Sequence, residues 1–116
     1  MVTISPIIGY RDQRAALKWL AEAFGFQELE VHEAEGEIVH AEMSYGDGVI
    51  MLGREHKETS GVYVVVEDAD AHHARAVAAG ARVTRELSDQ DYGSRDYAAL
   101  DLEGNEWYFG TYRPKI

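Results

Sequence analysis

The sequence predicts an α+β fold made of two tandem βαβββ modules, because one series of helix caps and stops occurs twice. Asp12 precedes a helical run that ends at Gly25, and Asp68 precedes a second run that ends at Gly80. Aspartate is a favoured N-cap, and glycine is a favoured residue just after a helix. The offset between the two caps (68 − 12 = 56) is nearly the same as the offset between the two stops (80 − 25 = 55).

Matching turns extend the repeat beyond the helices. The turns YGDG and DLEG end at Gly48 and Gly104, which have the same offset as the caps (104 − 48 = 56). Short runs rich in apolar residues between such turns are typical of strands. We expect strands at about residues 3–10, 27–33, 37–45 and 49–53, and then at about 61–66, 82–87, 95–102 and 106–112. Module one then covers about residues 1–56 and module two about 57–116, within a single domain.

Both expected helices carry an apolar stripe that predicts which face packs on a sheet. In the first helix the stripe consists of Ala16, Leu17, Leu20, Ala23 and Phe24. In the second helix the stripe is weaker and consists of Ala71, Ala74, Val77 and Ala78. His72 and His73 are adjacent on this helix and point about 100° apart, so we do not expect them to form a pair of metal ligands.

Composition excludes several classes of function. The 116 residues carry 21 acidic and 11 basic side chains, a net charge of −10 that disfavours binding to nucleic acid. There are no cysteines, which removes disulfides and thiolate chemistry. The apolar runs are too short to span a membrane, and MVTISPIIGY has no basic region of the kind that begins a signal peptide. We therefore expect a cytoplasmic protein with no membrane or nucleic-acid partner.

Several segments resemble one known family. PIIGYRD, AALKWLAEAFGF, VIMLG and the closing YGSRDY and DLEGNEWYFGT are similar to segments of the vicinal oxygen chelate superfamily, in particular its small PhnB-like branch. Glyoxalase I, extradiol dioxygenases and bleomycin resistance proteins belong to this superfamily. Leu102 stands where the branch usually has proline. The resemblance implies a curled, partly open eight-stranded mixed sheet with helices on the outer face, an inner cavity, and a homodimer.

The resemblance also implies four metal-ligand positions, on the first and last strand of each module. In this chain they correspond to Ser5, Leu52 or a neighbour, Gly61, and Tyr108. A divalent metal needs several converging nitrogen or oxygen donors, and these residues do not supply them. We therefore expect no metal and no cofactor, and neither glyoxalase I nor extradiol dioxygenase chemistry.

Strand alternation then divides the side chains between the helices and the cavity. If Tyr108 faces the cavity, Trp107 and Phe109 face the helices and belong to the core. The candidate ligand-binding residues on the cavity side are Tyr63, Tyr108, Tyr112, Ile7, Ile50, Leu52, His40, Glu42 and Arg54. Aromatic and aliphatic walls with a few polar groups are typical of small-molecule pockets. Packing that fills the concave face, or buries it in a dimer, is the alternative.

Three functions remain open at this stage. The leading hypothesis is a metal-free protein that binds a small hydrophobic or aromatic compound, with sequestration of an antibiotic as its concrete form. The acidic surface favours a cationic ligand. The second hypothesis is a metal-independent lyase or isomerase that uses His40 as the base, assisted by Glu42 or Tyr108. The third is a non-catalytic interaction domain whose concave face is covered by a partner.

Arg95 has two interpretations of its own. It can bind an acidic group of a ligand, or it can form a structural salt bridge with Asp91, Asp96 or Asp101. In so acidic a chain, we favour the salt bridge.

Overall fold

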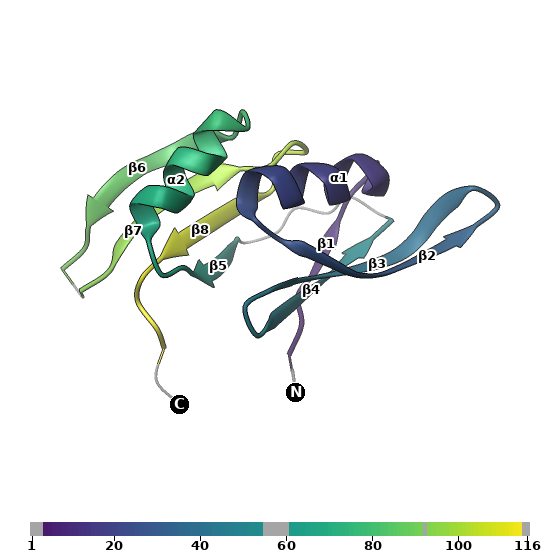
Figure 1. Ribbon diagram of the computed structural model, residues 1–116, viewed down its shortest axis with the longest axis horizontal. Helices are drawn as coiled ribbons and strands as arrows, with labels where there is room; N and C mark the ends of the chain where they lie inside the picture. The colour runs from purple at the N-terminus through teal and green to yellow at the C-terminus, as the bar shows by residue number, and fades with distance from the viewer. Residues whose placement is uncertain (1–3, 55–60, 92, 115–116) are drawn as a thin grey trace. The chain divides into compact units, whose positions relative to one another are not determined.

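The structure is a computed structural model that describes residues 4–54, 61–91 and 93–114. The chain divides into two compact units, Met1–Glu58 and Thr59–Ile116, each with one four-stranded mixed sheet (Figure 1). No helix in the described part of the chain has the length and apolar composition needed to cross a membrane.

The first unit begins with the short strand β1, which pairs in parallel with the last strand of the unit. The remaining neighbours pair antiparallel, and the strand order is β1-β4-β3-β2. Its elements are β1 Ile7–Gly9, α1 Gln13–Trp19, the π-helical turn η1 Leu20–Phe24, β2 Gln27–Ala34, β3 Glu37–Tyr45 and β4 Gly48–Gly53.

The second unit has the same connectivity. Its strand order is β5-β8-β7-β6, with β5 parallel to β8 and the other neighbours antiparallel. Its elements are β5 Val62–Val65, α2 Ala69–Ala78, β6 Arg82–Asp89, β7 Arg95–Leu100 and β8 Glu106–Gly110. The expected α+β fold with two βαβββ modules is therefore confirmed, and the eight strands are divided between two four-stranded sheets.

The first helix follows the sequence closely. The Asp12 carboxylate accepts a hydrogen bond from the backbone N–H of Ala15 at 3.0 Å, which satisfies one of the unpaired donors at the helix start. Gly25 ends the helical segment with φ of 82°, a conformation that glycine adopts without steric cost. The whole predicted stripe is buried: Ala16, Leu17, Leu20, Ala23 and Phe24.

In the second helix, the predicted face is wrong. Asp68 caps the helix as expected, accepting from the backbone N–H of Ala71 at 3.0 Å. The buried residues, however, are Ala69, His72 and Ala76, whereas Val77 is 48% exposed. The remaining residues of the predicted stripe, Ala71, Ala74 and Ala78, are also exposed. His72 stays in the core because its ring nitrogen Nδ1 lies 2.6 Å from the Tyr97 hydroxyl and its ring stacks 4.2 Å from Phe109.

One face of each sheet packs on the helix of its own unit, and this face holds the core. Trp107 and Phe109 of β8 are fully buried there, as predicted, together with Tyr97 of β7. In the first sheet, Ala41 and Met43 of β3 are also fully buried. The core of each unit thus lies between its helix and its sheet.

Ile50 and Leu52 of β4 belong to this core and do not face the expected cavity. They pair with Met43 and Ala41 across the sheet, and both are buried. Directly paired strand residues point to the same face, so Met51 is the β4 residue that points away from the helix.

The error has a simple geometric origin. Ile7 and Tyr63 are equivalent positions of the repeat (63 − 7 = 56), but the offset between their strand partners, Met51 and Tyr108, is larger by one (108 − 51 = 57). Strand β4 begins at Gly48, at the end of its turn, whereas Asn105 separates the second turn from the start of β8. This extra residue shifts the repeat by one, and a shift of one reverses the face of every side chain on the strand.

Candidate functional site

Each sheet has a second face, opposite its helix, which we call the helix-free face. In the first sheet this face presents Ile7 of β1, Met51 of β4, and Glu42 and His40 of β3. Ile7, Met51 and Glu42 are successive cross-strand partners. Ile7 is 68% exposed, and its part in ligand binding stays a prediction.

His40 and Glu42 form a close pair on this face. The Nε2 atom of His40 lies 2.9 Å from Oε2 of Glu42, and both side chains are about one-third exposed. Residues two apart on a strand point to the same face, which is why this spacing brings them together. A carboxylate beside an imidazole fixes the orientation of the ring, and a histidine held in this way can act as a general base.

The helix-free face of the second sheet is aromatic. Tyr63 of β5 and Tyr108 of β8 are direct partners in the parallel pair of strands. The Tyr63 hydroxyl donates to the backbone carbonyl of Tyr112 at 2.8 Å, and the Tyr108 hydroxyl donates to Oε1 of Glu106 at 2.8 Å. This bond to a carboxylate, together with burial, raises the pKa of Tyr108 because it favours the neutral phenol. Both rings are thus held in place by their hydroxyl groups.

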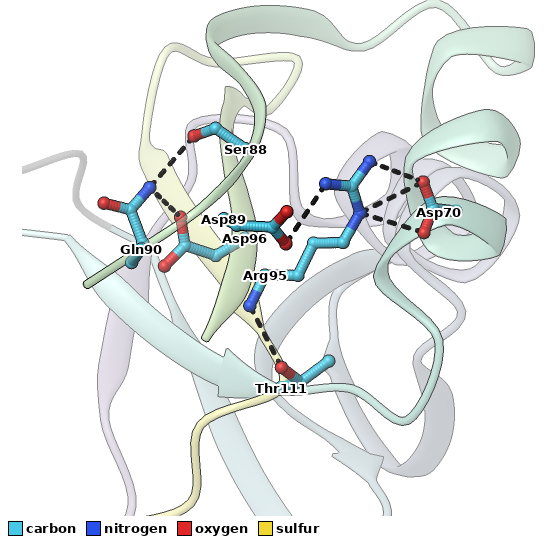
Figure 2. Close-up of polar contacts among 7 residues, drawn as sticks. All are labelled: Asp70, Ser88, Asp89, Gln90, Arg95, Asp96 and Thr111. Atoms are coloured by element: carbon cyan, nitrogen blue, oxygen red, sulfur yellow. Dashed lines mark hydrogen bonds and ion pairs between the residues drawn. The ribbon is translucent and has the colours of Figure 1, made fainter. Parts of the chain in front are cut away.

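An ion pair between an exposed arginine and a buried aspartate lies beside the two rings. Nη2 of Arg85 donates to Oδ1 of Asp96 at 2.6 Å, and the guanidinium carbon lies 5.5 Å from the centre of the Tyr108 ring. Asp96 is only 1% exposed, and Nε2 of Gln90 also donates to it at 3.1 Å (Figure 2). Gly110 lies directly beside this carboxylate, where an added Cβ would come 2.7 Å from the Asp96 Cβ. Only glycine therefore fits at this position of β8.

Sequence reasoning missed Arg85 and Asp96. Strand alternation predicted site residues on β1, β3, β4, β5 and β8 and none on β6 or β7. In addition, β6 has register irregularities on both sides of Arg85, so a period of two does not hold along it. The only available signal was the presence of a basic residue in β6 and an acidic residue in the next strand, β7; the two are not direct cross-strand partners.

Two other candidates lie elsewhere. Tyr112 contributes its backbone carbonyl to Tyr63 and is 40% exposed. Arg54 follows β4 and lies within 3.5 Å of Glu37 at a polar cleft of about 390 Å³, which it lines together with Arg11 and Arg14 beside the start of α1. Arg54 was predicted to face the cavity together with Ile50 and Leu52. This prediction is wrong for the same reason, the shift of the repeat by one residue.

Arg95 forms a salt bridge, but not with the expected partners. Its guanidinium binds the carboxylate of Asp70 through Nε and Nη2, each at 3.0 Å, and Nη1 donates to Asp89 at 3.3 Å (Figure 2). The hydrogen bond from Arg95 holds the pKa of Asp70 below its usual value, and the two carboxylates raise the pKa of Arg95. The backbone N–H of Arg95 also donates to Oγ1 of Thr111 at 3.1 Å. Arg95 thus joins the start of α2 to the end of β6.

Comparison with known proteins identifies the family. A family model of the Glyoxalase/Bleomycin resistance protein/Dioxygenase superfamily matches residues 3–109. The chain belongs to this superfamily. The crystal structure of TioX from Micromonospora sp. ML1 is similar, with a TM-score of 0.84, 32% sequence identity and 99% of each chain covered.

Other similar proteins are more distant. The uncharacterized protein Mb0911c of Mycobacterium bovis is 28% identical over 123 residues, covering 92% of this chain and 81% of that protein. A family enzyme from Burkholderia phytofirmans PsJN has a TM-score of 0.72 at 20% identity, with 90% of this chain and 93% of that chain covered. The latter likeness shows the fold alone.

The residues at the superfamily's metal-ligand positions do not fit a metal. The Ser5 hydroxyl donates to the carbonyl of Val49 at 2.6 Å, and Leu52 lies in the core. Gly61 has no side chain, and a Cβ added there would lie 2.9 Å from the Tyr108 ring. Among the described residues, no three His, Asp or Glu side chains gather to form a metal site. A soft thioether at Met51 and a neutral phenol at Tyr108 do not form the donor set that a divalent cation requires.

Proposed function

We propose that the protein binds a small planar, partly hydrophobic molecule without a metal, through the helix-free face of its second sheet. The observation that carries the proposal is the pair of rings at Tyr63 and Tyr108, which lie on neighbouring strands with both hydroxyls already hydrogen bonded. Rings fixed in this way lose little conformational freedom when a ligand stacks on them. Sequestration of an antibiotic or another toxic compound is the concrete form of this function.

Membership of the superfamily supports a ligand-binding function, and the donor set supports one without a metal. Aromatic rings beside a few polar groups are the usual lining of small-molecule sites. On the first unit, the predicted site residue Ile7 is an exposed apolar side chain. We propose that the two units act as one domain in this function, and that the chain belongs to the PhnB-like branch.

A thermal-shift screen against metabolites and antibiotics tests the binding function. A ligand that binds only the folded protein raises the melting temperature. We expect Tyr108→Ala to weaken binding of any hit, and Tyr108→Phe to retain most of it because the ring remains. Val77→Ala, on the exposed side of α2, is the matched control and should change nothing. Equal binding by Tyr108→Ala and the wild type contradicts the proposal.

The pair of His40 and Glu42 favours a second candidate function, a metal-independent lyase or isomerase. In this case His40 acts as the general base and Glu42 orients its ring, through the contact of 2.9 Å. Turnover that is lost in His40→Ala and reduced in Glu42→Gln supports the enzyme. The control is His32→Ala, since the exposed His32 ring lies 5.8 Å from that of His40 on the neighbouring strand. Unchanged turnover in His40→Ala rules this function out.

We also propose that the protein is a homodimer, as the resemblance to the superfamily implies. A sheet with exposed edges, such as β2 in the first unit, is commonly protected by pairing or by a partner. Sedimentation at micromolar concentration should give twice the 13.0 kDa mass of the chain. A monomer mass contradicts the dimer. If a partner protein covered the face that contains Tyr108, the third hypothesis, an interaction domain, would replace ligand binding.

A further inference from the structure

Arg85 is a fixed cation with unused hydrogen-bond donors. Among the described residues, its guanidinium makes one hydrogen bond, from Nη2 to Asp96, and one contact with the face of Tyr108. The side chain is 46% exposed. Arginine presents several N–H donors in a rigid planar fork, and most of them are not engaged here.

The acidic groups near Arg85 are already occupied. Asp96 is buried and accepts from both Arg85 and Gln90. The carboxylate of Glu106 accepts from the hydroxyl of Tyr108 at 2.8 Å and from that of Thr84 at 3.2 Å. Glu106 keeps its negative charge, but both of its oxygens already accept hydrogen bonds, so the guanidinium is the charged group beside the rings that has donors to spare, although the whole chain has a net charge of −10.

We propose that Arg85 determines ligand specificity on this face, and that it selects a planar molecule carrying a carboxylate or a similar oxyanion. The inference rests on the proposed binding function and adds the chemical class of the ligand. The ring of the ligand lies against Tyr63 and Tyr108, and its oxyanion accepts hydrogen bonds from the free donors of Arg85. Asp96 is a positioning residue that holds the guanidinium in place.

Local contact outweighs overall charge in this case. The acidic surface attracts cations over distances of about one Debye length, roughly 8 Å at physiological salt, and this attraction is screened. A direct hydrogen bond between guanidinium and carboxylate acts at contact and requires matching geometry. The selected ligand is therefore an anion, whereas the net charge alone predicts a cation.

Three probes that share one ring system test the proposal: naphthoate, its neutral amide and the naphthylmethyl ammonium cation. Their dissociation constants are measured by NMR titration. For the wild type, we expect naphthoate to bind roughly 10- to 100-fold more tightly than the amide, the range expected for hydrogen bonds to a charged group. The ammonium probe should bind most weakly, and the preference for naphthoate should decrease at high salt.

Variants of Arg85 separate the local from the global effect of charge. Arg85→Gln should abolish the preference for naphthoate, whereas Arg85→Lys should keep part of it. Since Arg85→Gln leaves the buried Asp96 without its cation, Arg85→Gln combined with Asp96→Asn is a second variant that removes both charges. The control Arg14→Gln makes the same change in net charge at an exposed arginine of the first unit and should leave the preference intact.

Each outcome bears on one of the two proposals. Three results overturn the role of Arg85 but leave a binding face in place. The ammonium probe binds most tightly, naphthoate and the amide bind equally, or the preference for naphthoate is unchanged both in Arg85→Gln and in its combination with Asp96→Asn. Failure of all three probes to shift any resonance of the second sheet overturns both the inference and the aromatic binding face. Loss of the preference in Arg14→Gln assigns it to overall charge and also overturns the inference.

Discussion

The two helix-free faces are built on the same plan but carry different chemistry. In the first sheet, β1 and β4 place Ile7 beside Met51, and in the second, β5 and β8 place Tyr63 beside Tyr108. The same architecture thus presents an aliphatic pair on one face and an aromatic pair on the other.

The neighbouring strand differs in the same way. On β3, His40 and Glu42 contact each other and remain partly exposed, whereas their equivalents on β7, Asp96 and Ala98, are buried. The first face therefore offers a pair for proton transfer, and the second offers rings beside a fixed cation, Arg85. Repetition of a module fixes the positions of side chains, and their identities decide between an enzyme and a binding protein.

The largest expected effect tests whether the cores of the two modules are equivalent. Trp107 is fully buried, and its indole N–H donates to Asp101 at 3.1 Å. Trp107→Ala should lower the free energy of unfolding by about 3–5 kcal/mol, because it removes a large buried ring and leaves a cavity. Chemical denaturation measures this change. The equivalent variant Ile50→Ala should also be strongly destabilising, and a near-neutral result for either contradicts the assignment of faces.

The next prediction tests the one-residue shift on β4. Leu52 is fully buried, so Leu52→Ala should lower the free energy of unfolding by about 2–5 kcal/mol. Met51→Ala, on the helix-free face of the same strand, should have a clearly smaller effect because Met51 is only half-buried. Denaturation of the two variants under identical conditions gives the comparison. If Met51→Ala were more destabilising than Leu52→Ala, Leu52 would lie on the ligand-binding side and Met51 in the core.

Much of the fold could be predicted from the sequence because caps, turns and stripes are local signals. Asp12, Gly25 and Asp68 act as local interactions require, whatever the rest of the chain does. The direction of β4 is different, because it depends on the span between two cross-strand partners, which is one residue longer from Ala98 to Tyr108 in the second module than from Glu42 to Met51 in the first. A period of two magnifies this small difference into a complete reversal of faces.

The buried face of α2 was within reach of the sequence, but polarity concealed it. The offset between the helix caps places His72 at the position of Ala16, and Ala76 at that of Leu20, and all of these are buried. A search for apolar residues overlooks a histidine in a core, because burial of an imidazole requires a hydrogen-bond partner that only the tertiary structure supplies. Here that partner is Tyr97. Likewise, the pairing of Arg85 with Asp96 depends on strand pairing and bulges that no local pattern encodes.

An intermediate effect is expected at His72, which the predicted stripe of α2 leaves out. His72→Ala removes a buried ring whose centre lies 4.2 Å from that of Phe109, together with the 2.6 Å hydrogen bond between Nδ1 and the Tyr97 hydroxyl. The Tyr97 hydroxyl keeps its longer bond, at 3.4 Å, to the backbone carbonyl of residue 72. Loss of a buried hydrogen bond costs about 1 kcal/mol and the cavity left by the ring adds to it, so we expect destabilisation of about 1–3 kcal/mol. The exposed Val77→Ala should change the free energy of unfolding by less than about 0.5 kcal/mol. Equal stability of the two variants contradicts the observed orientation of α2.

The smallest effect is expected at the ion pair between Arg95 and Asp70. In the first unit the position equivalent to Asp70 is Arg14 (70 − 14 = 56), which pairs instead with Glu33 of β2. The pKa of Asp70 is lowered in the folded protein, chiefly by the hydrogen bond from Arg95. The pair therefore stabilises the fold above the usual pKa of 3.8, and this contribution is lost as the pH falls through the lowered value. Asp70→Asn should thus be slightly less stable than the wild type at neutral pH, and the difference should vanish in acid.

Denaturation of both proteins across this pH range, at low and high salt, measures the contribution of the pair. The Asp70 side chain is 62% exposed, so solvent and salt should screen most of the attraction. Asp70 also lies in the first turn of α2, where a carboxylate interacts favourably with the helix dipole. Arg95→Gln and the double variant separate the two effects, because only the ion pair contributes a coupling between the substitutions. If Asp70→Asn lost the same stability with Arg95 present or absent, the dipole alone would account for it, and Arg95 would be free to serve another function.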